Sequence, residues 1–179
     1  MFQPIIGGPG RERILSLLGW RTVAYEENGM DIRPLADRAD VIPIVAEWLH
    51  TELNPEQRTR AAIERQLVEN KARRDSLPIT FVALIGSDVV GTVSLDESDL
   101  PPYDHLSPWL ASLYVVPPHR GSGIGRALVV HATGFARSKC ALPIHLWTQK
   151  AAGFYEQCGW RRMHSDVYLG LPITVMKFE

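Results

Sequence analysis

The sequence has little that would mark a secreted or membrane-spanning protein. Its two cysteines, Cys140 and Cys158, are too far apart for a CxxC motif and too few for a disulfide framework, so we expect reduced thiols in a cytoplasmic protein. No apolar run approaches the roughly 18 residues that a membrane-spanning helix needs. At the amino terminus, charged residues precede the short apolar stretch, which is the wrong order for a signal peptide.

An excess of charge is also missing. The chain carries 19 basic and 20 acidic residues, a formal net charge of -1, so it has no general attraction to nucleic acid or to an anionic membrane. His50, His131 and His164 show no spacing typical of metal ligands. We therefore expect no metal, no nucleic-acid partner and no membrane partner.

One long stretch lacks carboxylates. Between His105 and Tyr155 there is no Asp or Glu, although the overall composition predicts about six in a stretch of this length. The basic residues in the same stretch are Arg120, Arg126, Arg137, Lys139 and Lys150. A basic segment without carboxylates favours a polyanionic ligand such as a nucleotide.

The composition that is present, 45% hydrophobic and 22% charged, is that of an ordinary globular protein of about one domain. We expect an extension over residues 1–29 and one domain over 30–179. Alternating and β-branched runs predict strands at 31–35, 79–85, 89–95, 109–116, 143–148 and 172–178. Helical spacing predicts helices from Asp40 as N-cap with Pro43 in the first turn, from Asn54 and Pro55, from Ile124, and over 151–157. This order indicates an α/β fold with a mixed sheet, in which the 109–116 strand is buried on both faces.

A glycine-rich turn separates the 109–116 strand from the helix that begins at Ile124. Residues 119–126 read His-Arg-Gly-Ser-Gly-Ile-Gly-Arg. Glycines allow backbone N–H groups to point inward, and a helix start adds partial positive charge, so this turn can hold a phosphate or pyrophosphate. The alternative is a tight turn in which the glycines are needed only for their positive φ angles and bind no ligand.

Other phosphate-binding and nucleophile motifs fit this turn poorly. A P-loop requires a Gly-Lys-Ser/Thr end that is missing here, and a GxGxxG fingerprint from Gly121 would need glycine where Arg126 stands. The acidic residue that would bind a ribose is also missing. Ser122 is not in a GxSxG elbow, because Arg120 occupies its first position. These departures argue against a nicotinamide enzyme, an ATP enzyme and a serine hydrolase.

Two blocks of the sequence resemble the GNAT superfamily of N-acetyltransferases. The family signature Arg/Gln-x-x-Gly-x-Gly/Ala is matched by Arg120, Gly123 and Gly125, and the later block Phe/Leu-Tyr-Glu ending in Gly-Phe/Trp is matched by residues 154–160. The resemblance covers about residues 30–179. It implies a mixed, mostly antiparallel sheet of six to seven strands flanked by about four helices.

The resemblance also implies a reaction, the transfer of an acetyl group from acetyl-CoA to an amine of a small molecule or peptide by direct attack. A splayed strand end would bind the pantetheine arm, and the amides of residues 121–126 would hold the pyrophosphate. Thr148 stands where many relatives have an asparagine, so the sequence departs from the family at one side-chain contact to the cofactor. The implied cofactor-binding residues are Leu113, Tyr114, Val115, Val116, Arg120, Gly121, Ser122, Gly123, Ile124, Gly125, Arg126, Thr148 and Phe154.

Tyr155 matches the family's tyrosine that protonates the departing thiolate. The alternative is a tyrosine packed between helix and sheet with its hydroxyl satisfied. The protonated amine must also lose a proton, so a base or a water chain is required. The candidates are Asp96, Glu97, Asp99, Asp104 and His105, with Glu97 first because carboxylates near this strand end often serve related enzymes. These acidic residues could instead attract a cationic substrate or form a solvated loop.

A second class of function also fits the sequence, a non-catalytic domain that binds or senses acyl-CoA. Retention of Tyr155 argues against that alternative. The expected partner is an amine whose identity the sequence does not encode, and a homodimer is a further option.

Overall fold

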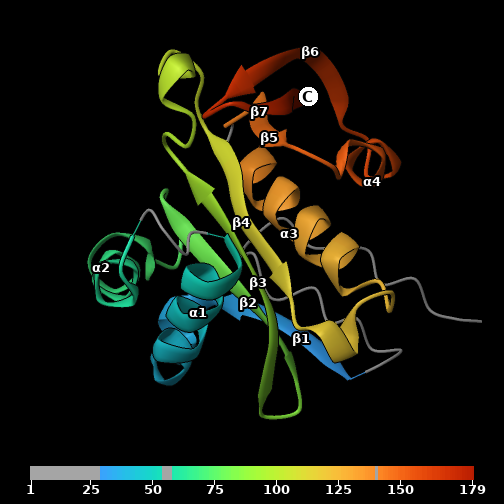
Figure 1. Cartoon of the computed structure of the whole chain (residues 1–179). Coiled ribbons are helices and arrows are strands. Elements are labelled where there is room, and N and C mark those ends of the chain that lie inside the picture. Colours follow the sequence, from blue (N-terminus) through green and yellow to red (C-terminus); the bar gives the residue numbers. More distant parts are fainter. Residues whose placement is uncertain (1–28, 54–57, 140) are drawn as a thin grey trace, which may run out of the picture.

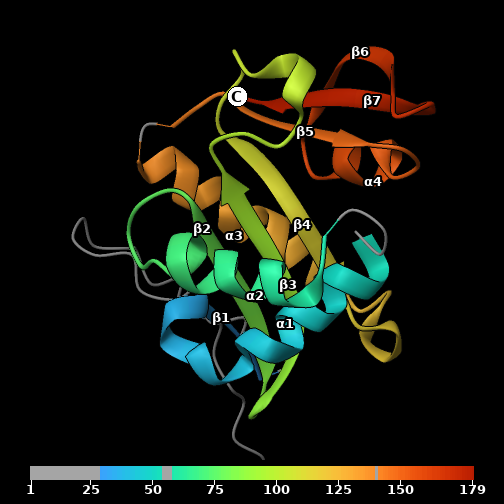
Figure 2. The same cartoon turned by 60° about the vertical axis from the view of Figure 1, so that its left-hand side comes forward.

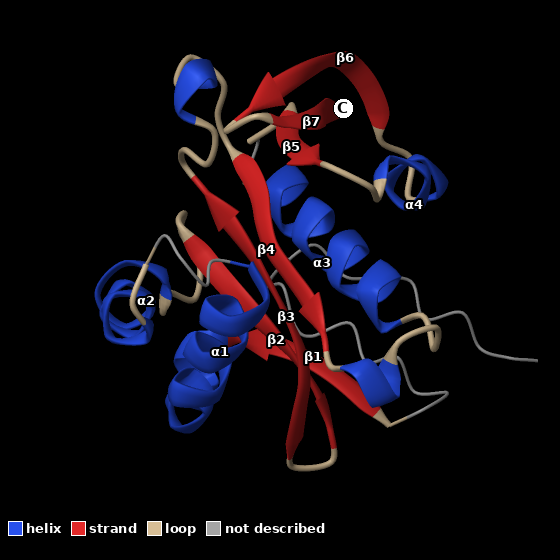
Figure 3. Cartoon of the chain, in the orientation of Figure 1, coloured by secondary structure: helices blue, strands red, loops and turns tan. Residues whose placement is uncertain are grey.

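The computed structural model describes residues 29–53, 58–139 and 141–179. Almost all of the predicted extension and the helix start predicted at Asn54 and Pro55 lie outside these residues, as does Cys140. The described chain forms one sheet with helices on both of its faces (Figures 1 and 3).

The sheet has seven strands in the order β1-β2-β3-β4-β5-β7-β6. The strands are β1 (Met30–Pro34), β2 (Ile79–Ile85), β3 (Asp88–Asp96), β4 (Trp109–Val115), β5 (Ile144–Thr148), β6 (Arg161–Tyr168) and β7 (Leu171–Phe178). Only β4 and β5 are parallel neighbours, and every other neighbouring pair is antiparallel. The predicted mixed, mostly antiparallel sheet is therefore confirmed.

In the part of the chain that the structure describes, four α-helices flank the sheet, as predicted. They are α1 (Ile42–Trp48), α2 (Arg60–Gln66), α3 (Ile124–Ser138) and α4 (Ala152–Gln157). Shorter helical segments are η1 (Leu35–Val41), η2 (Leu49–Leu53), η3 (Leu67–Lys71), η4 (Pro101–Tyr103) and η5 (Pro117–His119). Helix α3 packs on one face with α4 near its start, and α1 and α2 cover the other face (Figures 1 and 2).

The main core lies between α3 and the sheet. Phe81 of β2 makes an edge contact with Phe135 of α3, with ring centroids 5.3 Å apart, and Leu128 of α3 is fully buried. A smaller core under α1 and α2 contains Val45, Ile63 and other apolar residues. The two cores fix the helices on opposite faces of β4, the strand that borders the candidate site.

Close approach of α3 to β3 requires a glycine at position 91. A Cβ atom there would lie 2.9 Å from the Tyr114 carbonyl oxygen and 3.1 Å from Leu128 Cδ1. Gly91→Ala should lower the free energy of unfolding by about 1–3 kcal/mol in urea titrations, because overpacking forces backbone shifts. Gly153→Ala is the matched control, since a Cβ there meets nothing within 4 Å. A variant at Gly91 as stable as this control would show that α3 is not packed so tightly on β3.

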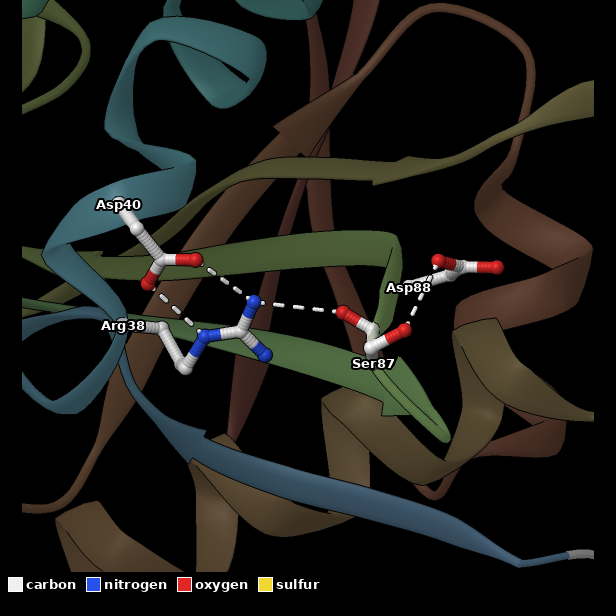
Figure 4. A network of polar contacts seen from close by, with 4 residues as sticks. All are labelled: Arg38, Asp40, Ser87 and Asp88. Carbon is white, nitrogen blue, oxygen red and sulfur yellow. Dashed lines mark hydrogen bonds and ion pairs between the residues drawn. The ribbon is translucent and has the colours of Figure 1, made fainter.

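The predicted N-cap at Asp40 is wrong. Its carboxylate accepts hydrogen bonds from Arg38 Nε at 2.9 Å and Arg38 Nη2 at 2.8 Å, and Nη2 also donates to the Ser87 carbonyl (Figure 4). The guanidinium thereby ties η1 to the turn between β2 and β3. Helix α1 begins only at Ile42 without a side-chain cap, and Pro43 lies in its first turn as predicted.

Helix α2 begins at Arg60, and Thr59 is its N-cap. The Thr59 Oγ1 atom accepts a hydrogen bond from the Ala62 N–H at 3.2 Å, which satisfies one of the donors that a helix start leaves unpaired.

The sequence patterns do not predict strand β6. It is the outermost strand of the sheet and pairs only with β7, and all of its residues except the last are exposed. Because neither face of β6 is buried, its sequence has no alternation of apolar and polar residues.

Candidate active site

Strands β4 and β5 diverge after a single point of contact. Trp109 and His145 form the one parallel register pair, and the His145 N–H donates to the Pro108 carbonyl at 2.8 Å. Beyond this pair β5 leads toward α4 while β4 continues toward η5 (Figure 1). The carboxyl-terminal half of β4 therefore borders an opening in the sheet on its β5 side.

A β-bulge distorts β4 beside this opening. Thr92 pairs with Tyr114 and Ser94 pairs with Ala111, so Ser112 and Leu113 together face one residue of β3. Ser112 has φ 56°, a left-handed conformation that is costly for a residue with a side chain. Bulges of this kind redirect backbone groups next to active sites.

The prediction that residues 109–116 are buried on both faces is wrong for one face in the second half of the strand, although Tyr114 in that half is buried. Leu113 and Val115 are only partly buried, whereas Trp109 and Leu110 at the start are fully buried. The reason is the departure of β5, which removes the neighbour that would have covered this edge.

The glycine-rich turn lies where β4 ends and α3 begins. Gly121 has φ 79° and Gly123 has φ 87°, so both positions need glycine for their backbone conformation. Within the described part of the chain, no acceptor is present for the backbone N–H groups of residues 121–126. These amides at the start of the 15-residue helix α3 can bind an anion.

Side chains of the turn fix its shape. Arg120 Nε donates to the Val115 carbonyl at 2.9 Å, and its guanidinium lies 5.4 Å from the centre of the Tyr114 ring. Ser122 Oγ donates to the His119 carbonyl at 2.6 Å. Arg120 thus joins the turn to the end of β4, while the amides that follow keep their donors available.

The two sequence blocks lie side by side in space. A Cβ atom on Gly125 would lie 3.6 Å from the Phe154 ring, so α3 and α4 meet at the first turn of α3. Arg126 is close enough to Cys158 for its charge to offset part of the rise in that thiol's pKa, whose main cause is burial. The structure therefore brings residues 120–126 together with α4.

Tyr155 of α4 is buried with 8% of its surface exposed. Its ring packs edge-on against Phe154 at 5.0 Å and Trp160 at 6.0 Å between ring centroids. Its hydroxyl makes no hydrogen bond to any other described residue, and it is not among the side-chain atoms that are sealed from solvent. Burial raises the pKa of Tyr155 to about 12, and the nearby Cys158 adds to the shift. The phenol is therefore protonated at any physiological pH.

Thr148 ends β5 and shapes the turn into α4. Its Oγ1 accepts a hydrogen bond from the Ala151 N–H at 3.1 Å. The hydroxyl is thus engaged in a local turn.

The acidic residues after β3 have different surroundings. Asp96 is buried with 7% exposed and binds Lys71 Nζ at 2.6 Å. Glu97 is exposed and lines a shallow groove with Asn70 and Lys71 of η3. Asp99 Oδ2 accepts a hydrogen bond from Trp147 Nε1 of β5 at 2.8 Å. The interpretation of this segment as a solvated loop therefore fails at Asp96 and Asp99.

The pKa of Asp99 is raised to about 6, mainly by burial and further by the charge of Asp96, which outweigh the opposing hydrogen bond from Trp147 and charge of Lys71. Asp104 and His105 are exposed, and Asp104 accepts a hydrogen bond from Ser98 Oγ. No sequence signal separates Asp99 from its neighbours, because its burial depends on the distant Trp147.

In residues 29–53, 58–139 and 141–179, no group of three or more His, Cys, Asp and Glu side chains could hold a metal ion. No helix of the described chain is long and apolar enough to cross a bilayer.

Comparison with known proteins relates this geometry to one family. Residues 42–160 match the Acetyltransferase (GNAT) family. No match was found among curated proteins.

Solved structures share the fold at low sequence identity. A GNAT-family acetyltransferase from Streptococcus pneumoniae is 20% identical with a TM-score of 0.63, over 83% of this chain and 98% of that chain. An aminoglycoside 6'-N-acetyltransferase complexed with coenzyme A is 16% identical with a TM-score of 0.66, over 82% and 95%. The putative acetyltransferase yncA from Salmonella typhimurium, with acetyl-CoA, is 19% identical with a TM-score of 0.62, over 85% and 94%.

Proposed function

The chain belongs to the Acetyltransferase (GNAT) family, and we propose that it is an N-acetyltransferase that moves the acetyl group of acetyl-CoA to an amine by direct attack. The observation that carries this proposal is the row of unpaired amides over residues 121–126, beside the opening between β4 and β5. Donors of this kind at a helix start fit the diphosphate of coenzyme A.

The fit to coenzyme A can be followed along the chain. Residues 121–126 would bind the diphosphate, and the bulged edge of β4 at Leu113 would offer backbone groups to the pantetheine arm. Phe154 closes the α4 side of the turn. When bound, acetyl-CoA supplies an activated acetyl thioester to the opening in the sheet.

Tyr155 would donate its phenolic proton to the leaving thiolate. With a phenol pKa of about 12 and a thiol pKa near 8.5, this transfer is uphill by about 5 kcal/mol. The burial that raises the pKa of the phenol would also raise the pKa of a thiol held in the opening. This reduces the difference between the two pKa values. The role therefore depends on the proximity of the phenol to the departing sulfur.

The acceptor would approach from the face covered by α1 and α2. Trp48 of α1 lies 5.3 Å from Tyr114 of β4 between ring centroids, and the acidic loop after β3 lies on the same face. One of the fold relatives acts on an aminoglycoside. Small amines, aminoglycosides, peptide N-termini and lysine side chains are therefore the acceptors to compare.

A thiol-release assay tests the proposal. The purified protein is mixed with acetyl-CoA and one amine from each class, and free thiol is followed with a thiol-reactive dye, with amine-free reactions as the control. We expect thiol release that depends on at least one amine. Binding of acetyl-CoA without turnover of any amine would favour the sensing function, and binding of NAD without binding of coenzyme A would reject the cofactor assignment.

A further inference from the structure

Resting on the proposed function, we propose that Asp99, and not Glu97, is the catalytic base that takes the proton from the acceptor amine. The first ground is position. The Asp99 carboxylate binds Trp147, which lies two residues beyond His145, the point where β4 and β5 part. Two residues of strand correspond to about 7 Å, so Trp147, whose indole binds the Asp99 carboxylate, lies near the point where the opening between β4 and β5 begins.

The second ground is the face on which Asp99 lies. Trp147 packs with Trp109 and Leu100 under the loop that joins β3 to β4. This cluster is on the sheet face opposite α3, because Ile144 and Leu146 of the same strand point into the α3 core. The carboxylate therefore faces the side from which the acceptor would come, across the sheet layer from Tyr155.

The third ground is the hydrogen-bonding state of the carboxylate. Oδ2 is held by the indole N–H of Trp147, whereas Oδ1 has no partner among the described residues. Oδ1 is not sealed from solvent, unlike Asp96 Oδ1, which is buried. One oxygen is thus anchored and the other is available to accept a proton.

The charges around Asp99 match a base that works near neutral pH. Asp96 of β3 raises the pKa of Asp99, Lys71 of η3 opposes it, and burial is the largest cause of the shift. From β5 comes the Trp147 N–H, and the Trp147 ring contacts Tyr168 of β6 at 5.8 Å between centroids. A carboxylate with pKa near 6 holds an abstracted proton about 100-fold better than an ordinary aspartate. Glu97 is exposed and lacks such surroundings.

The proton balance is simple. The ammonium gives one proton to Asp99 Oδ1, and its freed electron pair forms the C–N bond with the thioester carbonyl carbon. As the C–S bond breaks, its electron pair leaves with sulfur, which takes a proton from Tyr155. The acylated nitrogen loses its second proton. By proton exchange with water, Asp99 then gives up its proton and Tyr155 regains one. Overall one proton is released for each acetyl group transferred.

Asp99→Asn tests the proposal, because the amide oxygen keeps the hydrogen bond from Trp147 but cannot act as the base. We expect kcat/KM to fall at least about 100-fold, with coenzyme A affinity unchanged. In the wild type, kcat/KM should rise with pH through about 6, since Asp99 must be ionised to accept a proton, and this limb should be lost in the variant. Asp75→Asn, an exposed aspartate in the turn before β2, is the matched control and should keep full activity.

Four outcomes separate the hypotheses. An active Asp99→Asn with an unchanged pH limb overturns the assignment, and an inactive Glu97→Gln beside such a variant returns the role to Glu97. A purely structural role predicts lower stability or weaker coenzyme A binding with the pH limb intact, which also overturns it. If the wild type turns over no amine, the proposed function itself fails and Asp99 has no proton to take.

Discussion

Tyr155→Phe is expected to lower kcat about 100-fold while the affinity for coenzyme A stays unchanged. The phenylalanine ring keeps the packing against Phe154 and Trp160 and loses only the unpaired hydroxyl. Loss of a positioned acid typically costs 100-fold or more. Steady-state rates with saturating acetyl-CoA, together with the dissociation constant of coenzyme A, measure the two effects separately.

The loss should be the same at every pH between about 6 and 9. Because the pKa of Tyr155 is about 12, its phenol stays protonated across this range and imposes no alkaline limb there. Tyr103→Phe is the matched control, since that hydroxyl lies on the surface in a network with His164 and Asp166. Equal turnover by the wild type and Tyr155→Phe would remove the tyrosine from the mechanism.

Gly123→Val is expected to weaken coenzyme A binding by a factor on the order of 100. At φ 87° a β-branched residue is a severe outlier, so the turn must leave the conformation that directs its amides outward. Each tenfold loss corresponds to about 1.4 kcal/mol of binding free energy, and several charge-assisted hydrogen bonds depend on this turn.

Backbone strain alone must be separated from loss of the binding site. Gly170, in the turn between β6 and β7, has φ 78° and nothing within 4 Å of its Cβ direction, so Gly170→Val carries a similar strain. We expect both variants to lose a comparable amount of stability and only Gly123→Val to lose coenzyme A affinity. Equal affinities in the two variants would contradict the role of the turn.

The elements that the sequence predicts well are those whose signal is local. The hairpin of β2 and β3 follows from two β-branched runs around Gly86, and the turn at Gly121 and Gly123 follows from the need for positive φ. Helix boundaries were harder to predict. The sequence predicts Asp40 as the N-cap of α1, but its carboxylate is paired with Arg38, which also donates a hydrogen bond to the distant Ser87 carbonyl.

The parts of the site that the sequence does not predict depend on contacts between distant segments. The bulge at Ser112 has no glycine to mark it, and its register is set by β3. Asp99 and Glu97 are both acidic residues in the segment after β3, and no local pattern distinguishes them. Only the fold places Asp99 against Trp147. The opening between β4 and β5 is implied by the family resemblance alone, because no pattern in the residues encodes it.

The central claim is that the amides of residues 121–126 bind the diphosphate of coenzyme A. Isothermal titration calorimetry with coenzyme A and with pantetheine, which lacks the diphosphate, tests it directly. We predict saturable binding of coenzyme A at one site, with pantetheine binding far more weakly. Equal affinity for the two ligands, or no heat with coenzyme A in protein shown to be folded by circular dichroism, would contradict the claim.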